Sequence, residues 1–199
     1  MSIPRLLCVA IVAGTCCSCA SAPIHYYSLT PATSAMSPGT RPACCNLEVA
    51  SVRIPAEVDR AELVARQSDS ELVVLDNEAW ISPLRDEIKS ALLNEIRLRI
   101  SGRKADAAAP QKITVRVNVQ HFESVPASYA LVQVAWRLTL SLPPNELTCD
   151  CQTTAKIEVA PGVPALVRGH QQALAKVGDQ IAASVVELQQ GGNPPCPTE

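Results

Sequence analysis

The sequence predicts an α/β (α+β) domain built as a two-layer sandwich, in which a mixed, mostly antiparallel sheet carries two long amphipathic helices on one face. Apolar and polar residues alternate over residues 113–119, 130–142 and 151–159, a pattern typical of strands with one covered face. Two longer segments, at 82–100 and from 163 onward, repeat apolar residues every three or four positions, as one face of a helix does. Two such helices can cover the single apolar face of the sheet.

The shorter strands are predicted in the N-terminal half of the domain. Residues 47–54 are rich in Val, Leu and Ile and form one strand, which ends at Pro55. Residues 62–66 and 71–75 are predicted as the two strands of a hairpin around the polar segment 67–70.

The helix at 82–100 has the clearest end signals. Ser82 can cap its start, and Pro83 suits its first position. Asp86 and Glu87 favour the positive end of the helix dipole. Its apolar stripe repeats every four residues: Leu84, Ile88, Leu92 and Ile96.

The last helix begins near Val163 and also has one apolar stripe. The stripe is formed by Leu166, His170, Leu174, Val177, Ile181, Val185 and Leu188. Because His170 falls on this stripe, we predict a histidine packed in the core or at its boundary. Residues 191–199 follow the helix with Gly and Pro and are predicted to form a flexible tail.

The N-terminus is predicted to be a secretory signal peptide, at residues 1–18. A start with Arg5 is followed by an apolar run at residues 6–13 and then by small residues, which is the order of an export signal. The run is far shorter than the roughly 20 residues that cross a bilayer as a helix. No other segment of the sequence is long and apolar enough to span.

Cys19 is the preferred site of lipoprotein cleavage and acylation, because the small Ser18 precedes it. Cys16 and Cys17 are weaker candidates, and an ordinary secreted protein is the remaining alternative. Acylation would place covalent diacylglycerol and an N-linked acyl chain, such as palmitate, on Cys19. Three acyl chains would anchor the protein durably, since each buried CH₂ contributes about 0.8 kcal/mol. Ala20 follows where an aspartate would signal inner-membrane retention, so the outer membrane of a Gram-negative cell is predicted.

The remaining sequence divides into a lipidated segment and linker at 19–46 and one domain at 47–190. The formal net charge of −2 and a charged fraction of 18% argue against nucleic acid as a partner. Beyond Cys19 the cysteines are Cys44, Cys45, Cys149, Cys151 and Cys196. Their number is odd, so one thiol stays free or pairs between chains.

A disulfide from Cys44 or Cys45 to Cys149 or Cys151 is predicted, because the periplasm is oxidising. Zinc is disfavoured, since neither pair has the usual ligand spacing; we predict no metal. The sequence also lacks a nucleophile elbow, a phosphate loop and a dinucleotide fingerprint. We therefore predict a protein that is not an enzyme and has no cofactor.

An ordered set of short motifs is similar to a known family. In chain order they are Tyr26-Tyr27-x-Leu29, Ile54-Pro55-x-x-x-Asp59-Arg60, Leu63-Val64-x-Arg66 and Trp80-x-x-Pro83-Leu84. This order resembles the ABC-transport auxiliary lipoproteins of the PqiC type, from about Cys19 to the final helix. The resemblance implies an outer-membrane lipoprotein that faces the periplasm and has no catalytic residues.

The same resemblance implies a function and partners. Such a lipoprotein would dock the periplasmic MCE-domain protein of a lipid transport system, with its ABC permease and ATPase, to the outer membrane, as a homo-oligomer. The residues predicted to contact a partner are Tyr26, Tyr27, Asp59, Arg60 and Trp80. Two alternatives stay open: a free-standing periplasmic lipid carrier, and an assembly factor for another envelope complex.

Overall fold

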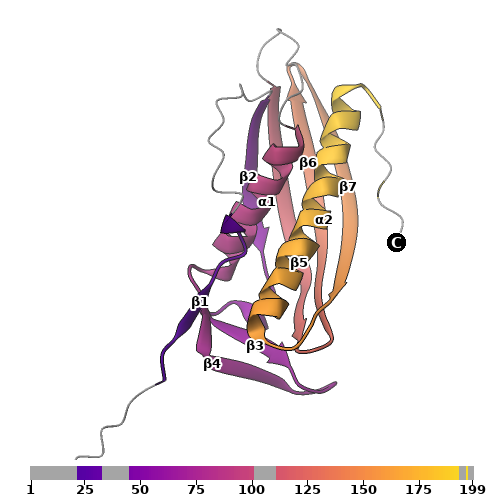
Figure 1. The fold of residues 1–199 in the computed structure, drawn as a ribbon. Coiled ribbons are helices and arrows are strands. Elements are labelled where there is room, and N and C mark those ends of the chain that lie inside the picture. The colour runs from indigo at the N-terminus through magenta and orange to yellow at the C-terminus, as the bar shows by residue number, and fades with distance from the viewer. Residues whose placement is uncertain (1–21, 33–44, 101–110, 193–195, 197–199) are drawn as a thin grey trace, which may run out of the picture.

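The computed structural model describes residues 22–32, 45–100, 111–192 and 196. The predicted signal peptide, Cys19 and Cys44 lie outside these residues. The elements follow along the chain (Figure 1) as β1 His25–Tyr27, β2 Cys45–Arg53, the 3-10 turn η2 Ala56–Val58, β3 Glu62–Arg66, β4 Leu72–Trp80, α1 Leu84–Ile100, β5 Gln111–Val125, β6 Tyr129–Leu142, β7 Asn145–Glu158 and α2 Val163–Gln189. Among the helices of the described residues, none has the length and apolar character that crossing a membrane requires.

Four strands form the larger sheet, in the order β2-β5-β6-β7. β2 is parallel to β5, whereas the β5–β6 and β6–β7 pairs are antiparallel. The sheet is therefore mixed and mostly antiparallel, as predicted. β5 and β7 are longer than predicted, because backbone pairing continues beyond the alternating segments. In β5 it passes a bulge between Val119 and His121.

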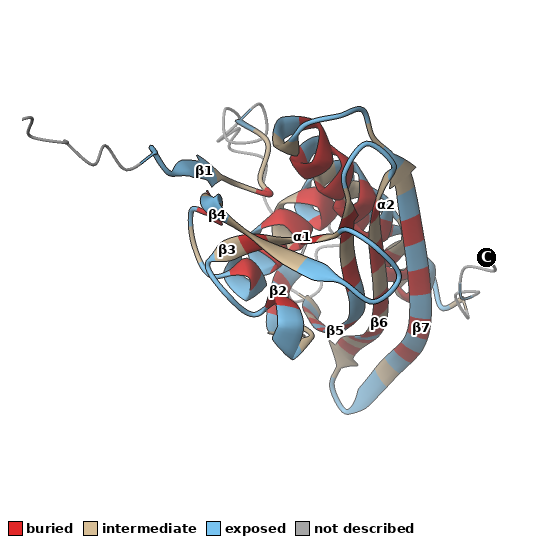
Figure 2. Ribbon diagram, turned by 90° about the horizontal axis from the view of Figure 1, so that it is seen from below, coloured by how far each residue is buried: buried red, intermediate tan, exposed pale blue. Residues whose placement is uncertain are grey.

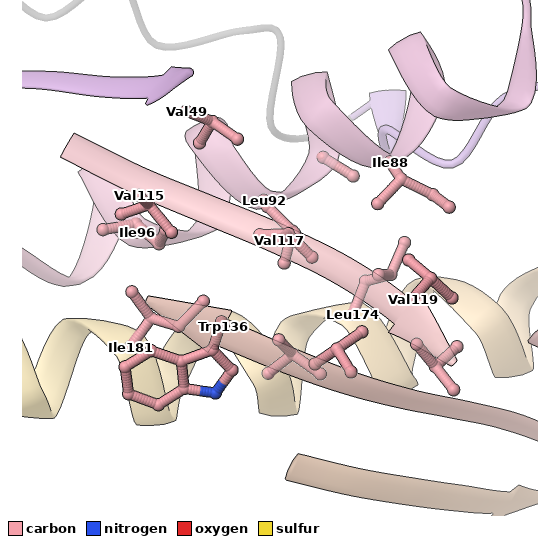
Figure 3. Close-up of a cluster of buried hydrophobic side chains, with 14 of the residues drawn as sticks. Val49, Ile88, Leu92, Ile96, Val115, Val117, Val119, Trp136, Leu174 and Ile181 are labelled. Atoms are coloured by element: carbon pink, nitrogen blue, oxygen red, sulfur yellow. The ribbon is translucent and has the colours of Figure 1, made fainter. Parts of the chain in front are cut away.

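Both helices lie on one face of this sheet, which confirms the predicted two-layer fold. α2 packs over β6 and β7, α1 packs over β2, and the helices contact each other (Figure 1). Buried and exposed residues alternate along the strands because successive side chains point to opposite faces (Figure 2). Aliphatic side chains from both layers fill the space between them (Figure 3), including Val115, Val117, Leu92, Ile96, Leu174 and Ile181.

Two glycines allow α2 to pack closely against its neighbours. A Cβ at Gly169 would lie 2.4 Å from Cγ1 of Val159, and one at Gly178 would lie 2.7 Å from Cβ of Glu95 on α1. Both distances are shorter than van der Waals contact. The α1–α2 contact thus depends on the missing side chain at Gly178.

A second, smaller sheet lies at one end of the molecule, in the order β1-β4-β3 (Figure 1). β3 pairs antiparallel with β4, which confirms the predicted hairpin. β4 extends to Trp80, beyond the predicted end at residue 75, and its last residues pair in parallel with β1. β1 was not predicted, since a strand of three residues is too short to show a period.

Candidate functional site

The structure brings the predicted partner-contact residues together at the small sheet. Tyr26 and Tyr27 lie on β1, and Tyr27 is the register partner of Trp80 on β4. The loop that carries Asp59 and Arg60 is attached to the end of β4. The carbonyl of Ala61, which follows Arg60, accepts a 2.8 Å hydrogen bond from the Trp80 amide. Residues from three separate parts of the sequence therefore meet at one end of the molecule.

An exposed apolar cluster lies at the β1–β4 side of this sheet. It consists of Ile24, Tyr26 and Ile81, whose exposed fractions are 51%, 60% and 60%. Ile81 is held beside β1 by a 2.8 Å hydrogen bond from its amide to the carbonyl of Tyr27. We call these three residues the N-terminal apolar cluster. Strand pairing and this hydrogen bond hold the backbone at Tyr26 and Ile81, while the side chains stay exposed, as a contact surface needs.

Tyr27 and Trp80 are less accessible than Tyr26. Tyr27 is half-buried, and burial together with the neighbouring Glu78 carboxylate raises its pKa to about 12, so its hydroxyl stays protonated. Trp80 is only 4% exposed and packs edge-on against Phe122 with the ring centroids 6.1 Å apart. The predicted partner contact through Trp80 is therefore corrected: its ring belongs to the core.

Asp59 and Arg60 are exposed and each has an ion-pair partner. Asp59 pairs with Arg85 at the start of α1, and Arg60 pairs with Glu62 at 2.9 Å. Exposed pairs of this kind contribute about 0–1 kcal/mol to stability. Arg60 also lowers the pKa of the Glu62 carboxyl. These pairs order the loop without burying it, so both residues remain accessible to a partner.

Glu87 is a structural anchor whose role the sequence does not predict. Its buried carboxylate accepts hydrogen bonds from the Ser28 hydroxyl and the Leu29 amide, both at 2.8 Å, and from the Ser82 hydroxyl at 2.6 Å. Gln171 of α2 donates to the Ser28 carbonyl at 2.9 Å. The segment after β1 is thus fixed to both helices. No local signal reveals the contacts to Ser28 and Leu29, because 59 and 58 positions separate these residues from Glu87.

One serine–histidine pair lies inside the domain. Ser124 Oγ and His170 Nε2 are 2.7 Å apart, and Phe122 stacks on the imidazole with centroids 4.0 Å apart. Both side chains are buried, and Nδ1 of His170 has no hydrogen-bond partner in the described part of the chain. Burial lowers the pKa of His170 to about 3. With both side chains buried and Nδ1 of His170 unpaired among the described residues, the pair is a core contact, which confirms the prediction that His170 is packed.

The cysteine pairing differs from the prediction. Cys151 on β7 bonds to Cys196 of the tail, and Cys149 is a buried free thiol. Cys45 begins β2, at the other edge of the sheet, so three strand spacings of about 4.8 Å each separate it from β7. A disulfide needs Cα atoms within about 7 Å, so the predicted bridge from Cys45 is wrong, and Cys44 lies outside the described residues.

Cys149 is close enough to replace Cys151 in this bridge. Its Sγ lies 3.3 Å from Sγ of Cys151, and all three sulfurs lie within 4.8 Å of one another. In Cys151→Ser protein we expect a bridge between Cys149 and Cys196, seen as one disulfide-linked peptide pair in a non-reducing digest. Cys196→Ser protein, the matched control, should lack any tail bridge. Alkylation of both Cys149 and Cys196 in Cys151→Ser protein would contradict the expectation.

Comparisons with known proteins identify the family. The model of the ABC-type transport auxiliary lipoprotein component matches residues 27–182. No curated protein sequence matches significantly. The structure is similar to that of an uncharacterized protein, at 18% identity and a TM-score of 0.63, over 82% of this chain and 99% of the other. It is also similar to that of the protein XCC0632 from Xanthomonas campestris, at 19% identity and a TM-score of 0.55. This match covers 75% of this chain and 91% of the other.

At such low identity the two structures establish a shared fold and nothing about activity. The family match is different, because it covers most of the chain, from the end of β1 into α2. It confirms the resemblance seen in the short motifs. The chain therefore belongs to the family of ABC-type transport auxiliary lipoprotein components.

Proposed function

We propose that this protein is a non-catalytic outer-membrane lipoprotein subunit that docks the periplasmic component of an ABC/MCE-type lipid transport system. Acyl chains on Cys19 would hold it at the periplasmic face of the outer membrane. Its partners would be an MCE-domain protein and, through it, a permease and an ATPase. Membership of the auxiliary family supports association with an ABC transport system; the outer membrane, the MCE partner and a homo-oligomer are parts of the proposal.

The observation that carries the proposal is the firm attachment of β1, which begins shortly after Cys19. Ile24 lies five positions after Cys19, a distance of at most about 18 Å along a fully extended chain. An acylated Cys19 would therefore keep the N-terminal apolar cluster and the small sheet near the membrane. Because Ser28 and Leu29 are hydrogen-bonded to Glu87 of α1, the rest of the domain would be held near the membrane as well.

The packed interior disfavours the alternative of a free-standing lipid carrier. A carrier needs an enclosed apolar cavity for acyl chains. In the described part of the chain, the space between helices and sheet is filled by aliphatic side chains (Figure 3). A surface hollow of about 430 Å³ lies on the open face of the larger sheet, outside this packed interior, and its lining includes charged side chains. An assembly factor for another envelope complex would differ in its partner, which the experiment below identifies.

The proposal is tested by a crosslinking pull-down from detergent-solubilised envelopes, with the wild-type protein and Cys19→Ser as baits. We expect wild-type protein to fractionate with outer membranes and to recover an MCE-domain protein. Cys19→Ser protein should move to the soluble periplasmic fraction and fail to support the outer-membrane barrier, because it carries no acyl chains.

Cys17→Ser is the matched control and should behave as wild type. An unchanged membrane fraction for Cys19→Ser would reject the tether at this residue. Recovery of no transporter component, together with co-purified lipid, would favour the carrier. Recovery of a different envelope complex would favour the assembly factor.

A further inference from the structure

Strand pairing assembles a row of charged residues on the open face of the larger sheet, opposite the helices. Across the strands, Ser51 of β2 pairs with Arg116 of β5, Arg116 pairs with Arg137 of β6, and Arg137 pairs with Asp150 of β7. Arg53 lies two residues after Ser51 and therefore projects from the same face. The sequence shows no basic run here, since the three arginines are far apart along the chain.

These residues surround a hollow of about 430 Å³. Its polar lining consists of Ser51, Arg53, Arg116, Asn118, Arg137 and Asp150, and Val117, Ala135, Trp136 and Cys151 complete it. β2 has a register shift between Val49 and Ser51, and such bulges bend a strand and redirect its side chains. The volume falls within the range of small-molecule sites, about 300–1,000 Å³.

The charges of the described residues that line the hollow do not balance. Arg137 binds Asp150 through two hydrogen bonds of 2.6 and 2.9 Å, and this contact lowers the pKa of the Asp150 carboxyl. Among the described residues, Arg53 and Arg116 have no ion-pair partner. Three guanidinium groups and one carboxylate leave a net charge of +2. Arg116 and Arg137 also face each other directly, and like charges in that position destabilise a sheet.

We propose that this hollow binds the phosphate group of a phosphate ester. A dianionic phosphate matches the net charge and would remove the repulsion between the arginines. Guanidinium groups bind phosphate oxygens with two parallel hydrogen bonds. The Ser51 hydroxyl and the Asn118 amide line the same hollow and supply neutral donors for the remaining oxygens. The site is independent of the proposed docking function, because it lies on the larger sheet.

The ester can be a free phosphorylated compound or the headgroup of a phospholipid, and the experiment separates the two. The protein is unacylated full-chain Cys19→Ser, so that an anchor does not cause membrane binding. Inorganic phosphate and glycerol 3-phosphate are titrated against chloride at matched ionic strength, with binding followed by arginine side-chain NMR signals. Vesicles of phosphatidylcholine, with and without phosphatidylglycerol, are tested by flotation.

Phosphate and glycerol 3-phosphate are expected to bind, and Arg116→Ala to weaken both at least about tenfold, the effect of losing one charged hydrogen-bonding partner. Arg168→Ala is the matched control, since Arg168 is exposed on α2, on the helix side. This variant should bind both phosphates with the affinity of the Cys19→Ser protein. Without ligand, Arg116→Ala should keep or raise the melting temperature, because it removes repulsion. A marked decrease would assign Arg116 a structural contact and overturn the proposal.

A free phosphate ester and a phospholipid headgroup would give different results in this experiment. Binding of the soluble phosphates without flotation identifies a free phosphate ester. Flotation only with phosphatidylglycerol vesicles, competed by glycerol 3-phosphate and lost in Arg116→Ala, identifies a lipid headgroup. Absence of phosphate binding overturns the proposal, as does binding of polyglutamate in preference to phosphate, which would point to an acidic protein partner instead.

Discussion

Replacing Glu87 by alanine is expected to lower the free energy of unfolding by about 3 kcal/mol, because it removes three hydrogen bonds to a buried charged acceptor. The change leaves the amide of Leu29 without its 2.8 Å partner in the interior. It also releases the Ser28 and Ser82 hydroxyls. Urea denaturation measures the stability, and hydrogen exchange at Leu29 measures the local release, which should be much faster than in wild type.

Two further variants separate this anchor from the general effect of a negative charge at the helix start. Asp86→Ala removes an exposed charge from the same first turn and should cost less than about 1 kcal/mol, the size of the helix-dipole effect. Glu87→Gln keeps one carbonyl acceptor for Leu29 and should retain part of the stability. Equal losses in Glu87→Ala and Asp86→Ala would show that the hydrogen bonds of Glu87 do not hold β1.

Stability is expected to fall by about 2 kcal/mol between pH 7 and pH 5 because of His170, at 1.36 kcal/mol per pKa unit. Burial lowers the folded-state pKa of His170 to about 3, whereas the unfolded chain has the ordinary value of 6.5. Below pH 6.5 the unfolded state therefore binds a proton that the folded state excludes. The stabilisation is complete above pH 6.5 and is lost progressively as the pH falls towards 3.

The control is His170→Gln, which cannot titrate but can still hydrogen-bond to Ser124. Its absolute stability should be lower at pH 7, since the stack on Phe122 is lost. Its free energy of unfolding should nevertheless change little between pH 7 and 5. Hydrogen bonds from Tyr129 and Arg66 lower the pKa of the Glu123 carboxyl, so this group titrates mainly below that window. The same pH dependence in both proteins would exclude His170 as its source.

The periodic spacing of apolar residues predicts the helices and the larger sheet of this fold. It does not predict contacts between segments that are far apart in the sequence. The stripe that includes His170 predicts α2 and its buried face, because each apolar position follows from helix geometry alone. β1 depends on pairing with the end of β4, more than 50 residues later, and therefore has no local pattern. For the same reason, the sequence predicts Glu87 at a helix start but not its role as an anchor.

In the candidate site, too, the sequence predicts some residues, whereas the burial and pairing of others depend on the fold. Tyr26, Asp59 and Arg60 could be selected from their motif order, and they meet at the small sheet. Trp80 belongs to the same motif order, yet its burial is visible only when Phe122 packs beside it. The bridge to Cys196 depends on the path of the chain after α2, which no periodicity encodes.

The parallel pairing of β1 with β4 has a mechanical consequence. A pull on the N-terminal segment would act nearly along the axis of β1, so it would load the hydrogen bonds between His25–Tyr27 and Glu78–Trp80 in shear. Bonds loaded in this way share the force, whereas bonds that open like a zipper break one after another. The carboxylate of Glu87 lies directly behind this joint and would carry the force into α1. The hydrogen bonds of Glu87 thus lie where a tethered domain would be strained most.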